Sequence, residues 1–443
     1  MQYIPIIGLE IHVQLKTKSK MFCSCDNSGE NKPPNTTVCP ICMGHPGVLP
    51  VPNKKAIEYA VLAALALNCK IEATKRHNNA TERQKITPTP PPYSKGELEG
   101  ITGVNWCSDG VEMASTKNNG AEMASIHRIR IKRVHLEEDA AKLLHTIEAG
   151  SDSGSERRSR LNVGTTPQNA DSASTLTGVG EAQRFSASTY VDFNRSGTPL
   201  LEIVTEPDFR SPQEAKIFLQ ELRLIMRYLK ISDADMEKGQ LRVDANVSLL
   251  PASAISSLSS AKSRLDNTNG YYPTNSANNS CNPRGERSEP ISEILYPKTE
   301  IKNLNSFKAV ERALEYEIMR QTKLFEAGTP PNKQSTRGWN DIKGITEEQR
   351  AKEESHDYRY FPEPDIPPFS IDSILWHSDG VETASTLPEL PAAKRERFKE
   401  EYGFTPSDAR ILTDDPYLAD YVEKVMSELY DWLKSLPEQI EGV

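Results

Sequence analysis

Long apolar runs are absent from this sequence. The longest purely apolar stretch is AVLAALAL, residues 60–67, whereas a helix that spans a bilayer needs roughly 18 such residues. The amino terminus, MQYIPIIGLEIHV, has neither the basic start nor the continuous apolar core of a signal peptide, because its apolar residues alternate with polar ones. We therefore expect no membrane segment and a cytoplasmic protein.

Net positive charge and cysteine are also scarce. The chain carries 53 Lys and Arg against 62 Asp and Glu, a net charge of −9, so no global basic field would attract nucleic acid by counterion release. The densest basic run is HRIRIKR, residues 127–133. Seven cysteines in 443 residues cannot all pair, and a reducing compartment disfavours disulfides. The balance of 37% hydrophobic and 26% charged residues suits two or three globular domains.

Four of the cysteines lie in one short segment, FCSCDNSGENKPPNTTVCPIC. They form a CxC pair and a CxxC pair, namely Cys23, Cys25, Cys39 and Cys42. Soft thiolates at such spacing suit a tetrahedral zinc ion. A redox CxxC pair is the alternative, but a second pair across a proline-rich loop favours a metal that closes a turn. Four protein thiolates leave no open position, so we expect a structural zinc, and we expect Cys69, Cys107 and Cys281 to be incidental.

Alternating apolar and polar residues predict several strands that share one apolar and one polar face. GLEIHVQL (8–15), LLEIVTEP (200–207), LRVDANVSL (241–249) and TEIKNLNSF (299–307) show this period. Their polar faces carry acids, amides and bases, namely Glu10, His12, Glu202, Arg242, Asp244, Asn246, Glu300 and Lys302. A wet face is ordinary for an antiparallel sheet, but Glu with His and Asp with Asn are also donors suited to Mg²⁺ and phosphate.

The segment IRIKRVHLEEDAAK, residues 129–142, changes its alternation phase midway. Ile129 and Ile131 alternate, but the apolar residues that follow are one position out of step, which predicts a β-bulge near Lys132 and Arg133. The strand then ends in three adjacent acids, residues 137–139. These acids are either a solvated strand end or metal ligands beside an anionic substrate, and the pattern alone does not say which acid would bind.

Capping residues predict two packing helices. Ser211, Pro212 and Glu214 begin one helix with a capping box and a proline at its first position. A second helix covers residues 306–327 and ends at Gly328. From about residue 389 the composition changes to short polar helices. Strands and helices together predict an α+β fold with a smaller helical part at the end of the chain.

Seven segments, in order along the chain, carry a resemblance to a known family. They are GLEIHVQLKTKSKMFCSC, CPICMGHPGVLPVPNKKAIEYA, RVHLEEDAAKL, DFNRSGTPLLEIVTEPD, LRVDANVSL, TEIKNLNSFKAVERALEYEI and HDYRYFPEPDIPP. Together they resemble the B subunits of tRNA-dependent aspartyl/glutamyl-tRNA amidotransferases. The resemblance implies a cradle-like catalytic domain over residues 1–385, built on an antiparallel sheet with packing helices and a zinc-held loop. It implies the start of a helical domain over 386–443, with the family's tail domain missing.

The resemblance also implies a reaction and its participants. The family resembles ATP-dependent ligases: the side-chain carboxylate of Glu on tRNA(Gln) or Asp on tRNA(Asn) is phosphorylated, and ammonia then displaces the phosphate. Implied partners are an amidase A subunit, a small C subunit and the tRNA; implied cofactors are ATP, Mg²⁺ and structural Zn²⁺. On this basis the catalytic candidates are Glu10, His12, Glu138 and Glu300. Mg²⁺ would be held by Glu10, His12 and Glu138, and the ATP side would use Arg242, Asp244, Asn246 and Lys302.

Several segments depart from the family pattern. NATERQKITPTPPPYSKGELEG stands where the family has an aromatic stretch, so that the region 71–125 is altered. Inserted loops are expected near 80–125, 147–187 and 251–290, the last two rich in Ser, Asn and Gly. WCSDGVEMAST (106–116) recurs as WHSDGVETAST (376–386). These departures keep open an alternative, a non-catalytic relative that retains the fold and the partner surface. Because the side chains of Glu and Asp differ by only one methylene, the sequence does not decide between Glu-tRNA and Asp-tRNA as the substrate.

Overall fold

A seven-stranded sheet forms the centre of the computed structural model, which describes residues 3–29, 32–69, 111–113, 127–149, 185–251, 296–351, 366 and 387–436. The strand order is β11-β10-β9-β8-β1-β7-β4. The strands are β1 (Tyr3–Gln14), β4 (Ile131–Glu138), β7 (Pro199–Thr205), β8 (Leu241–Pro251), β9 (Thr299–Leu304), β10 (Ser335–Asn340) and β11 (Ile345–Ala351). Neighbours are antiparallel, except that β9 and β10 are parallel. The expected antiparallel sheet therefore has one parallel pair, joined by a helical crossover.

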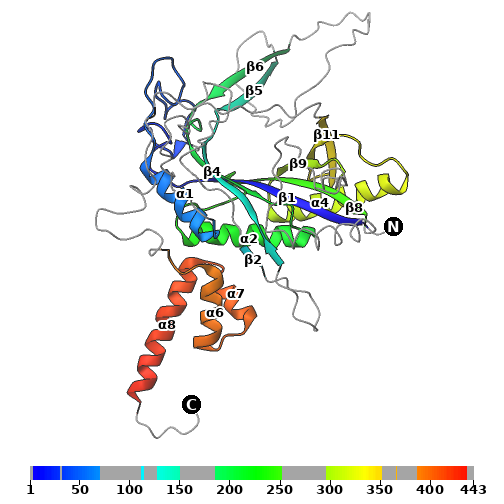
Figure 1. Ribbon diagram of the computed structural model, residues 1–443. Helices are drawn as coiled ribbons and strands as arrows, with labels where there is room; N and C mark the ends of the chain where they lie inside the picture. Colours follow the sequence, from blue (N-terminus) through cyan, green and yellow to red (C-terminus); the bar gives the residue numbers. More distant parts are fainter. Residues whose placement is uncertain are drawn as a thin grey trace, which may run out of the picture.

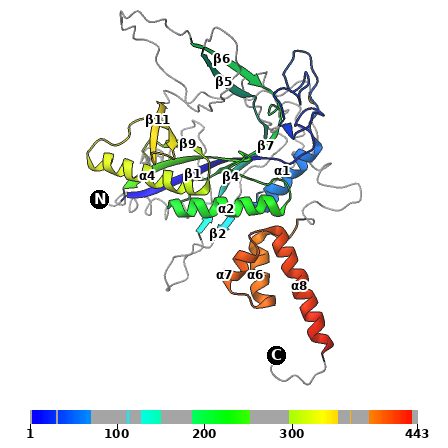
Figure 2. The same ribbon diagram turned by 180° about the vertical axis from the view of Figure 1, so that it is seen from behind.

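Three helices cover one side of this sheet, and two small hairpins complete the strands. The helices are α1 (Lys54–Ala66), α2 (Pro212–Tyr228) and α4 (Phe307–Glu326). The hairpins pair β2 (Val111–Met113) with β3 (His127–Ile129) and β5 (Lys142–Ala149) with β6 (Phe185–Asp192). The views in Figures 1 and 2 agree that α2 and α4 run side by side, with the β5–β6 hairpin on the opposite side.

The two helices predicted from capping residues are present. Ser211 Oγ accepts a hydrogen bond from the backbone N–H of Glu214 at 3.2 Å, and Ser306 Oγ accepts one from Ala309 at 3.1 Å. The Glu214 carboxylate also accepts the backbone N–H of Arg210, at 2.7 Å. The second helix ends before Gly328, whose φ of 72° is the left-handed conformation typical of a helix end.

The apolar residues of alternating strands make the core under these helices. Leu9, Ile11 and Val13 of β1 are at most 1% exposed. Val243 and Val247 of β8 are also buried, with exposed fractions of 3% and 0%. Because side chains alternate along a strand, the residues between them project to the opposite face. The predicted division into an apolar and a polar face is confirmed.

The predicted bulge in β4 is also confirmed. The pairing of β4 with β7 shifts register between Ile131 and Arg133. This shift lets Ile131, Val134 and Leu136 all enter the core, at 1%, 0% and 0% exposure. It also puts Arg133 on the polar face, where it binds Glu202.

A second, smaller core lies within the three final helices, α6 (Pro391–Tyr402), α7 (Pro406–Leu412) and α8 (Pro416–Ser435). Phe398, Ala409 and Ala419 are fully buried there against Tyr228 of α2. The Tyr228 hydroxyl donates to the Thr413 carbonyl at 2.9 Å, which anchors these helices to α2.

Several expectations from the sequence lie outside the described residues. These are most of the altered region 71–125, most of the loops 147–187 and 251–290, both copies of the SDGVE repeat apart from residues 111–113, and Cys107 and Cys281. Cys69 is described and is disulfide-bonded, which corrects our expectation that it is incidental. Within the described part of the chain, no helix is both long and apolar enough to cross a bilayer.

Candidate active site and metal sites

Strand register gathers polar side chains into a row across the middle of the sheet. His12 on β1 lies opposite Glu202 on β7 and opposite Arg242 on β8. Glu202 in turn lies opposite His135 on β4. Residues directly opposite one another in antiparallel strands share a face. Four strands from distant parts of the sequence therefore place two imidazoles, a carboxylate and a guanidinium in one line.

A buried cluster of metal-binding side chains centres on His12. The donor atoms of Glu10, His12 and Glu202 all lie within 4.8 Å of one another. His12 Nε2 is also 3.3 Å from Glu137 Oε1, while Glu10 Oε1 is 3.8 Å away. His12, Glu137 and Glu202 are only 6%, 1% and 4% exposed. Together with Glu10, whose side chain is 29% exposed, they offer the oxygen and nitrogen donors that a divalent metal ion binds.

Arg133 keeps one of these acids ionised. Its Nε and Nη2 atoms donate to the two Glu202 carboxylate oxygens at 3.0 and 2.9 Å, a bidentate pair. Burial alone would raise the pKa of Glu202, but the hydrogen bonds and charge of Arg133 outweigh it and hold that pKa below its usual range. Glu202 is therefore an anion at neutral pH.

The neighbouring strands carry a second set of charges on the same face. Lys302 Nζ donates to Asp244 at 2.7 Å and lies 3.0 Å from Glu300 Oε1, and Thr336 donates to Glu300 Oε2 at 3.0 Å. Burial would lower the pKa of Lys302, but the two carboxylates outweigh it and hold that pKa above its usual value. Asn246 lies opposite Glu300, and its buried Oδ1 has no hydrogen-bond partner among the described residues. This part of the face offers a fixed ammonium to a phosphate group, whereas the Asn246 Oδ1 atom is an acceptor that suits a donor or a cation.

The three adjacent acids at the end of β4 and just after it have three different surroundings. Glu137 contacts His12. Asp139 is 7% exposed and binds two guanidinium groups, Arg242 at 2.6 Å and Arg195 at 3.1 Å. Glu138 is partly buried, and its neighbours are Cys42 and Lys20; burial, with a smaller contribution from Cys42, raises the pKa of Glu138 to about 7.

Two of the residues favoured for Mg²⁺, Glu10 and His12, come together, and the third lies elsewhere. Among the described side chains, the third residue within ligand distance of Glu10 and His12 is Glu202, whereas the sequence analysis expected Glu138 in this role. Arg133 and His135 of this face were not named as site candidates, Glu137 was one of three acids left open as metal ligands, and Glu202 was placed on the polar face without a role. Alternation already put Glu202 on the polar face, but only the pairing of β1 with β7 shows that it reaches His12.

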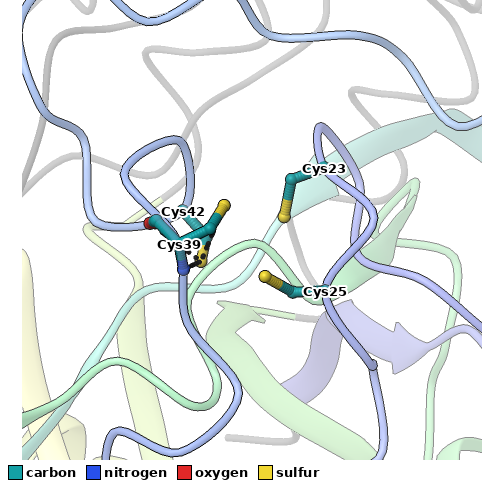
Figure 3. A group of neighbouring side chains, drawn as sticks. All are labelled: Cys23, Cys25, Cys39 and Cys42. Carbon is teal, nitrogen blue, oxygen red and sulfur yellow. Dashed lines mark hydrogen bonds between the residues drawn. The ribbon is translucent and has the colours of Figure 1, made fainter.

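The four clustered cysteines form a separate, compact donor set. Their Sγ atoms all lie within 4.8 Å of one another, and the side chains converge from two loops (Figure 3). The Cys39 and Cys42 sulfurs are 3.9 Å apart, close to the about 3.8 Å between sulfurs of a tetrahedral site with Zn–S of about 2.3 Å. A hydrogen bond with Cys23 lowers the pKa of Cys42 to about 5. The donor chemistry and spacing fit zinc.

Asn194 fastens the cysteine loop to the sheet. Its Oδ1 accepts the backbone N–H groups of Thr36 and Thr37 at 2.9 and 3.0 Å, and its Nδ2 donates to the Pro33 carbonyl at 2.7 Å. Asn194 is 3% exposed and follows β6. Asn194 lies in the segment between β6 and β7. The segment that holds the cysteine loop therefore leads directly into β7, the strand that carries Glu202.

Comparison with known proteins assigns a family to this arrangement. Residues 5–271 and 276–377 match the family described as the GatB/GatE catalytic domain. A relative from Roseiflexus sp., the B subunit of an aspartyl/glutamyl-tRNA(Asn/Gln) amidotransferase, is 40% identical over 430 residues, 96% of this chain and 69% of the relative. A protein of the same name from Thermoanaerobacter pseudethanolicus is 38% identical over 442 residues, 100% of this chain and 73% of the relative.

Proposed function

The chain belongs to the GatB/GatE catalytic domain family, and we propose from this that it is the catalytic B subunit of a tRNA-dependent amidotransferase. The enzyme is an ATP-dependent, glutamine-hydrolysing carbon–nitrogen ligase. It would phosphorylate the side-chain carboxylate of Glu on tRNA(Gln) or Asp on tRNA(Asn) and replace the phosphate with ammonia. The relatives' name, which includes both tRNA(Asn) and tRNA(Gln), supports this substrate class.

The cluster around His12 is the observation that carries the catalytic role. Glu10, His12 and Glu202 would hold the divalent cation, with Glu137 against the imidazole. When bound, Mg²⁺ would neutralise and orient the ATP phosphates, which is the main requirement of phosphoryl transfer. A carboxylate needs this activation because its own leaving group would be an oxide, whereas an acyl phosphate has a good one.

The other charged residues of the face would bind the phosphates and orient their partners. Lys302 would contact a phosphate oxygen, and Asp244 and Glu300 fix its position from two strands. Arg242 is oriented by Asp139 and borders the His12 row. Asn246 and Glu300 complete the proposed nucleotide side.

Glu138 keeps a separate place in the proposal. It is retained as a catalytic and magnesium candidate, although its described neighbours are Cys42 and Lys20. Substitutions at Glu138 and Glu202 distinguish the two candidates for the third ligand.

The cysteine cluster would hold zinc in a structural role, because all four positions of the ion are filled by protein thiolates. The proposed organisation is a cradle catalytic domain over residues 1–385 and a helical domain beginning at 386. The proposed partners are an amidase A subunit, which would supply ammonia, a small C subunit and the tRNA. The proposed location is the cytoplasm, where such tRNA is used.

Reconstitution tests the proposal. The chain would be combined with A and C subunits, ATP, Mg²⁺ and glutamine, and the conversion of Glu-tRNA(Gln) to Gln-tRNA(Gln) measured. Conversion that is lost in Glu10→Gln and His12→Ala, with the complex intact, supports a catalytic role for this chain. A complex that forms but converts neither Glu-tRNA(Gln) nor Asp-tRNA(Asn) identifies a non-catalytic relative.

A further inference from the structure

Lys20 is a fully buried lysine directly before the cysteine loop. Its exposure is 0%, and it is among the large, fully buried side chains of the described residues. Burying an ammonium group is costly unless charges and hydrogen bonds compensate it. A lysine in this position therefore needs a specific reason.

The contacts of Lys20 connect the cysteine loop to the connection before β7. Its Nζ donates to the Phe193 carbonyl at 3.1 Å and lies 3.7 Å from Cys42 Sγ. Its backbone N–H donates to the Cys25 carbonyl at 3.0 Å. One lysine thus contacts both halves of the cysteine cluster and the segment that leads into the active-site strand.

Glu138 completes this group on the other side. A Cβ placed on Gly197 would lie 3.5 Å from Lys20 Cδ, 3.5 Å from Cys42 Cβ and 3.6 Å from Glu138 Oε2. The side chains of Lys20, Cys42 and Glu138 therefore all pass close to one glycine, whose φ of +80° few other residues adopt. The Lys20 ammonium lies 3.7 Å from the Cys42 sulfur, and its charge also acts on the Glu138 carboxylate.

Charge explains why a cation is needed here. A zinc ion with four thiolates has a formal charge of about −2, and Glu138 adds another negative group when ionised. Groups that donate hydrogen bonds to metal-bound ligands stabilise the bound state of the metal. An ammonium within reach of Cys42, the buried member of the four cysteines, would offset part of this charge.

We propose that Lys20 is a positioning residue whose buried ammonium stabilises zinc-bound Cys42 and ties the zinc site to the Glu138 end of β4. This proposal rests on the zinc occupancy proposed above. It predicts that the charge of Lys20, and not only its volume, determines how tightly the chain holds zinc.

Three substitutions and one control separate charge from packing. Lys20→Met keeps the length of the apolar stem, Lys20→Gln keeps a donor without charge, and Lys20→Arg keeps the charge. Lys18→Met removes the same charge from an exposed position two residues away. Zinc affinity would be measured in the full chain by competition with a chromophoric chelator, and the Co²⁺ thiolate charge-transfer band would report the geometry of the site.

Lys20→Met and Lys20→Gln should weaken zinc binding about 10–100-fold, while Lys20→Arg retains most of the affinity and Lys18→Met is unchanged. If Lys20→Met binds zinc as tightly as Lys18→Met, Lys20 is only a packing residue and the proposal is wrong. If a variant is unfolded when purified, the zinc concentration that restores its circular dichroism gives the same comparison. A wild-type chain that binds no zinc would overturn the zinc proposal itself, a result distinct from equal affinities.

Discussion

His12 on β1 lies directly opposite Glu202 on β7, and both side chains are almost completely buried on the polar face of the sheet. The two strands are about 190 residues apart in sequence, so that only the sheet brings this imidazole and this carboxylate together. Together with Glu10 they form the cluster on which the proposed chemistry depends.

Removing the Glu202 carboxylate should abolish metal-dependent activity. Glu202→Gln is expected to lower the rate of tRNA amidation on the order of a hundredfold or more, because loss of one positioned charge-stabilising group has an effect of this size. Calorimetric titration with Mn²⁺ should show weakened binding. Glu237→Gln, at an exposed position in the turn before β8, is the control and should behave as wild type. If Glu138→Gln weakens Mn²⁺ binding and Glu202→Gln does not, the third ligand is Glu138.

Lys302 should act mainly on ATP. Lys302→Met removes the ammonium between Asp244 and Glu300 and leaves two partly buried carboxylates without it. We expect a higher KM for ATP and a rate lower by on the order of a hundredfold, with little change in the affinity for tRNA. Lys308→Met, an exposed lysine in the first turn of α4, serves as the matched control. Unchanged ATP kinetics in Lys302→Met would remove Lys302 from the phosphate side.

Zinc should stabilise the fold and take no part in the reaction. Cys39→Ser breaks the tetrahedral donor set and should lower the melting temperature and the zinc content together, whereas Ser24→Ala in the same loop should change neither. Residual activity should follow the folded fraction of the protein. Activity that disappears while the melting temperature stays unchanged would instead indicate a direct role for the metal.

The ion pair between Asp208 and Arg130 gives a prediction for pH. Arg130 Nε and Nη2 donate to the Asp208 carboxylate at 2.9 and 2.7 Å. Burial would raise the pKa of Asp208, but these hydrogen bonds and the charge of Arg130 outweigh it and hold the pKa below its usual value. The pair therefore contributes its full stability above the unfolded-state pKa of about 3.9, and this stability is lost as pH falls through the lower folded-state pKa.

Asp208→Asn tests this sign directly. The free energy of unfolding at pH 7 should fall by about 1–2 kcal/mol, at the low end because the Arg130 side chain is 42% exposed and screened by solvent. The difference between wild type and variant should shrink as the pH falls below about 4. Urea unfolding curves across this range measure it, and a difference that grows on acidification would contradict the assignment.

Alternation and spacing predict much of this structure. The faces of β1 and β8, the bulge in β4, both capped helices and the convergence of four cysteines follow from local patterns that act over a few residues. Local patterns do not give the pairing between distant strands. Glu202 reaches His12 through the pairing of β1 with β7, and Glu137 contacts His12 because the bulge sets the phase of β4. A shift of one residue exchanges the two faces of a strand, so the choice among adjacent acids required the fold.

Release of phosphate from ATP tests the central claim most directly. The chain would be reconstituted with the proposed A and C partners and supplied with Mg²⁺ and ATP without glutamine, with and without Glu-tRNA(Gln) or Asp-tRNA(Asn). We predict phosphate release that depends on the charged tRNA in the wild type and is lost in Glu202→Gln, while Glu237→Gln remains active. Release that is absent in the wild type, or equal in wild type and Glu202→Gln, would contradict the assignment of this face as the site of carboxylate activation.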